Sequence, residues 1–203
     1  MRLLVDNSKD AAREIARIVD MRLSFDALSN LTALLQPRKY RHKEHIQQAG
    51  DITENIAFIA KGLIRQYKTT DELDSTEDLC HEGDLLLCMG SLISRQPSEL
   101  YIQTLEPTVL YEIDYHELKM LALKLPEINE LLNRILESCI LKEMTRFQRQ
   151  DKHPVERYLD LLNSDSETVR RSPLKYVASY LRMAPETLSR VRNEVYKREN
   201  RNT

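Results

Sequence analysis

The C-terminal part of the chain contains the stretch that decides the fold, residues 174–192, which reads LKYVASYLRMAPETLSRVR. Its apolar residues are spaced as in two short helices that share one small core: Val177, Leu181, Met183, Leu188 and Val191. Residues 182–184 interrupt this pattern, and Pro185 suits the first position of the second helix, where its missing N–H costs nothing. Ala178 is small enough for two helices to cross at a steep angle. The spacing predicts a helix-turn-helix.

The second helix of this motif carries side chains of the types that bond nucleic-acid bases and phosphates. The candidate DNA-binding residues are Glu186, Thr187, Ser189, Arg190, Arg192 and Lys197. Residues 170–203 hold nine Lys or Arg and three Glu, a net charge of +6, whereas the whole chain carries −2. This asymmetry predicts that one end of the molecule binds a polyanion. A solvated basic face without a partner is the alternative interpretation of the charge alone.

Length and composition indicate a globular protein of one large or two small domains. The 203 residues are 41% apolar and 31% charged, which is ordinary for such proteins. No opening segment resembles a signal peptide, and no window approaches about eighteen uncharged apolar residues, so we expect no membrane span and no membrane partner. Cys80, Cys88 and Cys139 follow no framework spacing and fit reduced thiols. We therefore expect a cytoplasmic protein.

The first part of the chain predicts two helices. Residues 10–23 and 25–35 each place apolar side chains on one helical face. Asp6 or Ser8 would cap the first helix, Ser24 would cap the second, and Pro37 would close it.

From Lys39 onward the pattern changes to short runs of period two, as in strands. The predicted strands are residues 40–46, 55–60, 63–69, 76–80, 85–89, 100–105 and 109–113. Turn signals lie at residues 50–51, 61–62 and 82–84, and no helix-length segment intervenes. The even spacing favours a jelly roll or barrel over a parallel sheet.

Helices follow the strands. Residues 115–124 predict a short helix, and Pro126 begins a longer one whose apolar stripe is too broad for a single neighbour. We expect a homodimer through this long helix, with wholly intramolecular packing as the alternative. A hinge at residues 151–154 and a helix at 155–162 would lead into the motif. The predicted fold is α+β: N-terminal helices with a jelly-roll sensor domain (residues 1–115), a long dimerisation helix (116–150) and an all-α helix-turn-helix domain (151–203).

The order of these parts resembles the Crp/Fnr family of bacterial transcription regulators. The most specific matching pieces are FIAKGLIR at residues 58–65, EGDL at 82–85 and PETLSRV at 185–191. The resemblance covers roughly residues 25–194 and implies a cyclic nucleotide-binding-like sensor domain, a dimerisation helix and a helix from Pro185 that reads double-stranded DNA. It also implies RNA polymerase as a partner. Within it, Glu186 matches a position that commonly bonds cytosine and Arg190 one that commonly bonds guanine, and each such contact discriminates by about 1–3 kcal/mol.

The sensor positions depart from the family pattern. Members that bind cyclic AMP have a Gly-Glu pair for the ribose and an Arg-Ser pair for the phosphate, whereas this chain has Leu87–Cys88 and Ser98–Glu99. A buried phosphate would lose its guanidinium partner and meet a carboxylate, unless Arg95 reached in from nearby. We therefore expect a degenerate effector pocket that does not take cyclic AMP, with an effector that the sequence leaves open. No cysteine precedes Cys80, so we expect no iron–sulfur cluster.

Two residues of the helix-turn-helix also depart from the usual pattern. Arg182 occupies a turn position that is often Gly, and a positive φ there would cost on the order of 1 kcal/mol. Ala184 stands where a Ser or Thr cap would contribute roughly 1 kcal/mol. Few residues follow Arg192, which leaves little room for a β-wing. Further phosphate contacts would then come from Arg170, Arg171, Lys197, Arg198 or Arg201.

Enzymatic and metal chemistry find little support in the sequence. Cys80 and His81 are adjacent in a predicted strand, so their side chains should point to opposite faces and not share a proton. The same rule separates His42 from His45, and the sequence has no His-x-His pair or Gly-rich phosphate loop. We expect no catalytic residue, metal or cofactor. Beside a DNA-binding regulator, a small-molecule sensor with its ligand in the jelly roll and a jelly-roll metalloenzyme stay open.

Overall fold

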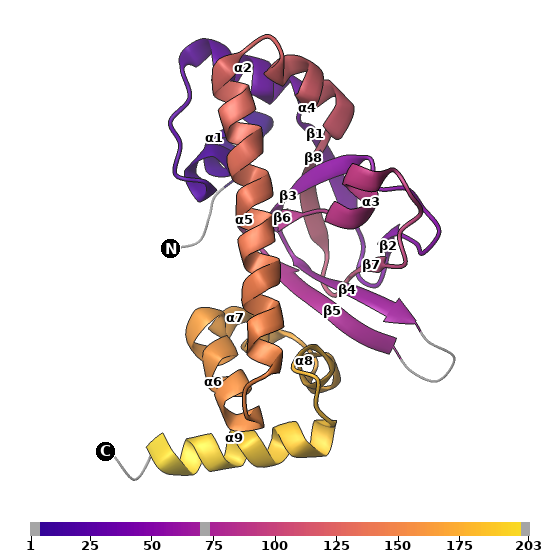
Figure 1. Ribbon diagram of the computed structural model, residues 1–203, viewed down its shortest axis with the longest axis vertical. Helices are drawn as coiled ribbons and strands as arrows, with labels where there is room; N and C mark the ends of the chain where they lie inside the picture. The colour runs from indigo at the N-terminus through magenta and orange to yellow at the C-terminus, as the bar shows by residue number, and fades with distance from the viewer. Residues whose placement is uncertain (1–4, 70–73, 200–203) are drawn as a thin grey trace.

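The computed structural model describes residues 5–69 and 74–199 of the chain. Their helices are α1 (Ser8–Ile18), α2 (Phe25–Leu34), α3 (Met89–Ser94), α4 (Tyr115–Ala122), α5 (Pro126–Gln150), α6 (Pro154–Ser164), α7 (Ser166–Arg171), α8 (Leu174–Tyr180) and α9 (Pro185–Glu199). Their strands are β1 (Gln36–Tyr40), β2 (His45–Gln47), β3 (Asn55–Lys61), β4 (Leu63–Thr69), β5 (Asp74–His81), β6 (Leu85–Leu86), β7 (Tyr101–Thr104) and β8 (Thr108–Asp114). Figure 1 shows α1 and α2 at one end, the strands in the middle and α6–α9 at the other end, with α5 running alongside.

The strands form two four-stranded antiparallel sheets, in the orders β1-β8-β3-β6 and β2-β7-β4-β5. Strand β3 shows why these sheets are covered on both sides, because every residue between its two ends is buried. Its even positions, such as Phe58, face the N-terminal helices, and its odd positions, such as Ile59, face the second sheet. At the β3–β4 turn Gly62 has φ 116°, and a Cβ there would lie 2.3 Å from the Oγ1 of Thr108, so only glycine fits. The predicted jelly-roll sandwich between two helical regions is confirmed.

The N-terminal helices and the first half of α5 form one core with the outer face of the first sheet. Ile128, Leu131 and Ile135 of α5 are buried in this core. The predicted cap at Ser24 is present, since its Oγ accepts a hydrogen bond from the amide of Ala27 at 3.3 Å. The same hydroxyl donates to Glu127 at 2.7 Å, which ties the start of α2 to the start of α5.

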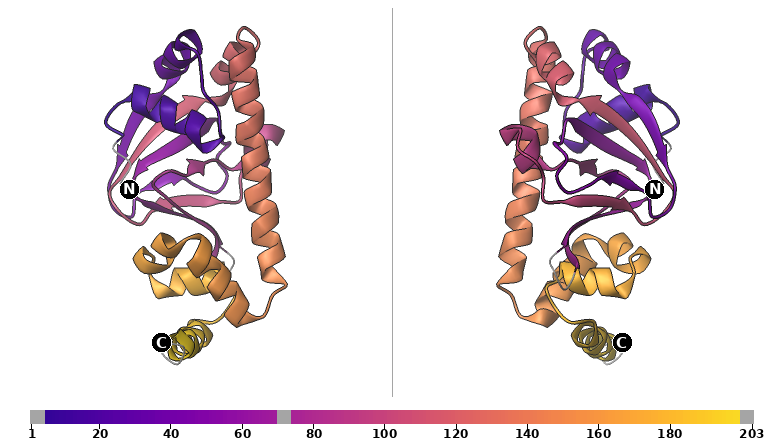
Figure 2. Two further views of the ribbon diagram at one scale, coloured as in Figure 1. Left: turned by 90° about the vertical axis from the view of Figure 1, so that its left-hand side faces the viewer. Right: turned by 90° about the vertical axis from the view of Figure 1, so that its right-hand side faces the viewer.

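The C-terminal helices form a second core together with the β-domain. Leu63, Leu79 and Leu105 come from the strands or from the loop beside them, and they pack against residues of α6, α8 and α9. Both views in Figure 2 show these helices below the sheets, at the end of the molecule opposite α1 and α2. The C-terminal helices are therefore attached to the sandwich by apolar packing as well as by the end of α5.

Two predicted strands are wrong in their extent. Residues 40–46 are not one strand: β1 ends at Tyr40, Lys43 adopts a left-handed backbone with φ 63°, and β2 starts at His45. Residues 85–89 are strand only at Leu85–Leu86, and Met89 begins the unpredicted helix α3. The other predicted strands match the observed ones to within one or two residues at each end.

The helix boundaries also need correction. The first helix ends at Ile18 because Asp20 is left-handed, and its cap is Asn7 where Asp6 or Ser8 was predicted. Pro37 does not close α2, which ends at Leu34; it lies in the edge strand β1, where its missing N–H is tolerated. The start of the long helix at Pro126 is confirmed, and helix α7 was not predicted.

Candidate DNA-binding helix and effector cleft

Helices α8 and α9 form the helix-turn-helix that the sequence predicts. Val177, Ala178, Leu181, Leu188 and Val191 are all buried in its core. Arg182 has φ 54°, so the predicted left-handed turn is confirmed. From α6, Arg157 donates hydrogen bonds to the carbonyls of Leu181 at 2.7 Å and Arg182 at 3.2 Å. These bonds to a charged donor offset the cost of the strained turn.

Helix α9 buries one side and exposes the other. The buried side consists of Leu188, Val191 and Val195. Of the predicted DNA-binding residues, Thr187 is half-buried, and the following are exposed: Glu186, Ser189, Arg190, Arg192 and Lys197. Among the described residues none of these five exposed side chains has a hydrogen-bond or ion-pair partner. Because Glu186, Arg190 and Lys197 are four and seven residues apart, they lie along one helix face.

The predicted auxiliary phosphate contacts are only partly available. Arg171 of α7 pairs with both Glu82 and Glu106 of the β-domain, so it fastens the two parts of the chain together and does not point to a nucleic acid. Burial alone would raise the pKa of Glu82, but the hydrogen bonds from Arg171 lower it to about 2. Arg170 pairs with Glu167 in its own helix. The side chain of Arg198 and all of Arg201 lie outside the described residues.

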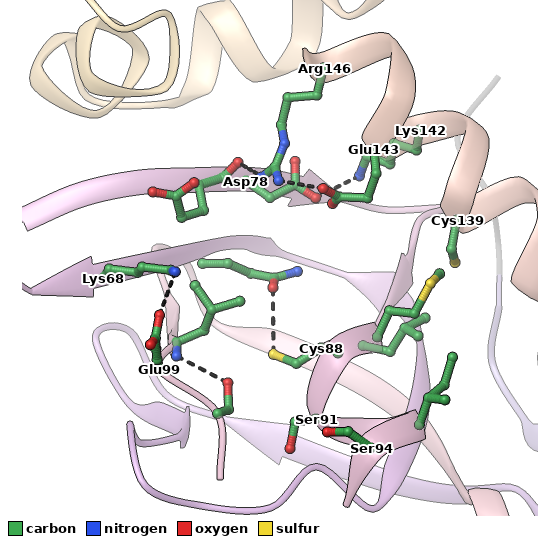
Figure 3. A pocket seen from close by; sticks show the side chains of 18 of the residues that line it. Lys68, Asp78, Cys88, Ser91, Ser94, Glu99, Cys139, Lys142, Glu143 and Arg146 are labelled. Carbon is green, nitrogen blue, oxygen red and sulfur yellow. Dashed lines mark hydrogen bonds and ion pairs between the residues drawn. The ribbon is translucent and has the colours of Figure 1, made fainter. Parts of the chain in front are cut away.

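A cleft of about 810 Å³ lies between the second sheet, helix α3 and helix α5 (Figure 3). The four predicted effector-pocket residues all line it: Leu87, Cys88, Ser98 and Glu99. Arg95 is exposed and is not among the lining residues, so it does not replace the missing phosphate partner. Sequence reasoning missed the charged residues that β4, β5 and α5 contribute: Lys68, Glu77, Asp78, Lys142, Glu143 and Arg146.

The charged groups of this cleft are paired with one another or with neighbours. Glu99 accepts from Lys68 at 2.6 Å, and this hydrogen bond lowers the pKa of Glu99. Asp78 pairs with Lys142 at 3.0 Å. Arg146 pairs with Glu143, one turn away on α5. The cleft therefore offers a nucleotide phosphate no unpaired cation among the described residues.

Cys80 and Cys88 are buried thiols and not reactive groups, and Cys139 is half-buried. Cys80 donates to Asp78 at 3.2 Å, and burial raises its pKa well above the ordinary thiol value. Burial also raises the pKa of Cys88, whose thiol donates to the side-chain oxygen of Gln66 at 3.7 Å. A protonated thiol is a weak nucleophile. As predicted, Cys80 and His81 point apart, because His81 bonds Asp165 of the C-terminal region at 3.0 Å.

Two further properties are established only for the described part of the chain. Within residues 5–69 and 74–199 no helix is both long and apolar enough to cross a membrane. In the same residues no group of three or more His, Cys, Asp or Glu side chains could hold a metal ion.

Comparison with known proteins agrees with this architecture. Residues 37–124 match the model of the cyclic nucleotide-binding domain. The fumarate and nitrate reduction regulatory protein of Vibrio cholerae is 25% identical over 191 residues, covering 87% of this chain and 76% of that protein.

Two solved structures share the fold. FixK2 from Bradyrhizobium japonicum has a TM-score of 0.69 at 18% identity, with 81% of this chain and 86% of that chain covered. The c-di-GMP responsive global regulator CLP from Xanthomonas campestris has a TM-score of 0.64 at 18% identity, with 85% and 91% covered. Residues 37–124 thus match a cyclic nucleotide-binding domain, and with the long helix and the C-terminal helices that follow, the architecture is similar to that of the Crp/Fnr regulators.

Proposed function

We propose that the chain is a homodimeric transcription regulator that binds double-stranded DNA through α9. The observation that carries this proposal is the row of exposed, partnerless polar side chains on a helix whose other side is anchored in a helix-turn-helix core. Arg190 can donate two hydrogen bonds to guanine, and Glu186 can accept one from cytosine. Lys197 and Arg192 would bind phosphates. The relationship to a regulatory protein of Vibrio cholerae supports the same role.

The exposed half of α5 supports the dimer. Its first half is buried in the chain's own core, but its second half exposes large apolar side chains: Ile140, Leu141, Met144 and Phe147, at 48%, 63%, 53% and 69%. Apolar residues in a row on one helix are typical of a two-fold interface. A dimer through this row would pair two copies of α9, as required to read two half-sites about 34 Å apart. RNA polymerase would be a further partner, and the protein would act in the cytoplasm.

The cleft supports a sensor role that does not depend on cyclic AMP. Its paired charges leave no cation for a cyclic phosphate, yet its volume of about 810 Å³ is large enough for a small molecule. The structurally similar regulator from Xanthomonas campestris is described as c-di-GMP responsive. A protein of this fold can therefore respond to a ligand other than cyclic AMP. A small-molecule sensor is therefore the second candidate function, and it is compatible with the first.

DNA binding is tested by fluorescence anisotropy. The labelled DNA is a set of promoter fragments from upstream of the gene that encodes this protein. The wild type should bind one fragment in preference to a shuffled sequence. Arg190→Ala should weaken specific binding by about 1–3 kcal/mol and relax the preference at one base pair. Lys197→Ala is the matched control, because losing a phosphate contact weakens all sequences alike and lowers the salt dependence. Equal binding of the wild type to both fragments, or unaltered specificity in Arg190→Ala, would count against base reading by α9.

Sedimentation velocity tests the dimer. The wild type should sediment as a dimer at micromolar concentration, and Phe147→Glu should shift it to a monomer because it places a charge in the apolar row. Glu137→Gln, elsewhere on the same helix, is the control and should leave the dimer intact. A wild-type monomer over the whole accessible concentration range would refute this interface.

A further inference from the structure

Strand β5 forms a wall of the effector cleft and also contacts the helix-turn-helix. Glu77 lines the cleft, and its carboxylate pairs with the guanidinium of Arg182 at 2.6 Å. Arg182 also donates to the hydroxyl of Ser75 on the same strand. The backbone N–H of Thr76 donates to the Oγ of Ser179 in α8 at 2.8 Å. Polar contacts from three consecutive residues of β5, Ser75, Thr76 and Glu77, therefore join this strand to the end of α8 and to the turn before α9.

The position of Arg182 gives these contacts a direct mechanical consequence. Arg182 is the left-handed residue of the turn, so its backbone sets the angle between α8 and α9. Its carbonyl is held by Arg157 from α6, while its side chain is held by Glu77. The side chains of Glu77 and Arg182 are 15% and 36% exposed, so solvent screens the pair less than it screens a pair on an open surface.

The long helix holds the same piece of β5 from the other side. Arg146 of α5 donates to the backbone carbonyl of Glu77 and pairs with Glu143. Both of these α5 residues line the cleft, as Figure 3 shows. The backbone at Glu77 thus lies between α5 and the helix-turn-helix, and a change in the cleft can reach the turn through a single residue.

We propose that Glu77 is a positioning residue for DNA reading: its pair with Arg182 fixes the orientation of α9 and couples that orientation to the contents of the cleft. This inference rests on the proposed DNA-binding function. With α8 held against β5 in this way, α9 lies at the free end of the molecule (Figure 1). Its residues Glu186, Ser189 and Arg190 are exposed there. The pair therefore holds a conformation that can bind DNA. Loss of the pair spreads α9 over several orientations, and affinity falls with the fraction that fits.

A double-mutant cycle of Glu77→Gln and Arg182→Gln tests this role in the full-length protein. The matched control is Glu130→Gln, which also removes a carboxylate paired with an arginine, Arg134, but on a part of α5 that does not line the cleft. Two measurements are made on each variant. One is the hydrogen-exchange rate of the Thr76 amide without DNA, which reports docking because this amide bonds Ser179. The other is affinity for the promoter fragment that the wild type prefers.

Glu77→Gln should speed exchange at Thr76 and weaken specific DNA binding roughly ten-fold, within the range usual for coupling between sites. The double variant should be no weaker than either single variant, since both remove the same interaction. Glu130→Gln should leave both quantities at the wild-type value. Unaltered exchange in Glu77→Gln would show that Glu77 does not hold the helix-turn-helix. Faster exchange with unchanged or tighter DNA binding would refute its role in positioning α9.

The failure of the DNA-binding proposal would look different. In that case neither the wild type nor any variant prefers a fragment, and the exchange rates still decide whether Glu77 holds the helix-turn-helix against β5.

Discussion

The effector cleft and the outer face of α9 are both rich in charge, but they use it in opposite ways. In the cleft each charged side chain has a partner within the chain, as Lys68 has Glu99 and Lys142 has Asp78. On α9, Glu186 and Arg190 are exposed and have no partner among the described residues. Charges already paired gain little from a charged ligand, whereas unpaired charges on an anchored helix are available to another molecule. The pairing of charges, more than their number, separates the two regions.

The largest effect on this difference is expected from removing the apolar packing that holds α9 in place. Leu188 is fully buried in the helix-turn-helix core, so Leu188→Ala should destabilise this region by about 2–5 kcal/mol through lost packing and a cavity. Specific DNA binding should be lost, while the backbone amides around the cleft stay protected from hydrogen exchange and its thiols stay buried. Urea unfolding followed by hydrogen exchange measures both regions. Leu123→Ala, at an exposed position on the far side of the molecule, is the control. Equal loss of protection in both regions would show that they unfold as one unit.

A smaller effect is expected where the β-domain meets the C-terminal helices. The hydrogen bond from His81 to Asp165 raises the pKa of His81 to about 9 from an ordinary 6.5, and the negative charge of Asp84 also raises it. Because the folded pKa is raised, the stabilisation is fully present below pH 6.5 and is lost as the pH rises through about 9. The loss should be on the order of 1 kcal/mol, since the pair is partly exposed to solvent.

Urea titrations on the acidic and alkaline sides of this window measure the loss. His81→Gln should remove most of the pH dependence in it. The control His116→Gln changes an exposed residue of α4, far from Asp165, and should leave the dependence as in the wild type. An identical pH profile in all three proteins would rule out the His81–Asp165 pair as its source.

The smallest effects are expected in the cleft itself. Lys68→Gln removes the partner of an exposed Glu99 and should leave the melting temperature unchanged. Millimolar cyclic AMP should likewise leave the melting temperature of the wild type unchanged, because the cleft has no unpaired cation among the described residues. Differential scanning fluorimetry measures both. A cyclic AMP-dependent rise in the melting temperature would overturn the expectation and the contrast with α9 together.

Local sequence patterns predicted those parts of the fold whose cause is local. The turn at Arg182, the cap at Ser24 and the start of α5 at Pro126 each depend on residues within one or two helical turns. Helix α3 was missed because its six residues, which include Leu92 and Ile93, are too few to show a helical period. The break between β1 and β2 was missed because its left-handed residue, Lys43, carries no local signal for that conformation.

The same distinction explains how much of the two candidate sites could be predicted. The face of α9 comes from one helix, so helical spacing was enough to group Glu186 with Arg190. The charged lining of the cleft comes from β4, β5 and α5, which are far apart in the sequence. No local pattern indicates that Lys142 will meet Asp78, or that Glu82 and Glu106 will engage Arg171. These pairings depend on the tertiary fold.

The two halves of α5 imply an order of assembly. The first half is covered by its own chain, so it can become ordered in a unimolecular step whose rate does not depend on protein concentration. The second half makes polar contacts with β5, such as that of Lys142 with Asp78, but it exposes its apolar row. A helical segment with little apolar packing is less stable in water. Its full ordering would then be bimolecular and would depend on how many copies are present. The number of gene copies would thus influence how much of the regulator is fully ordered, independently of any ligand in the cleft.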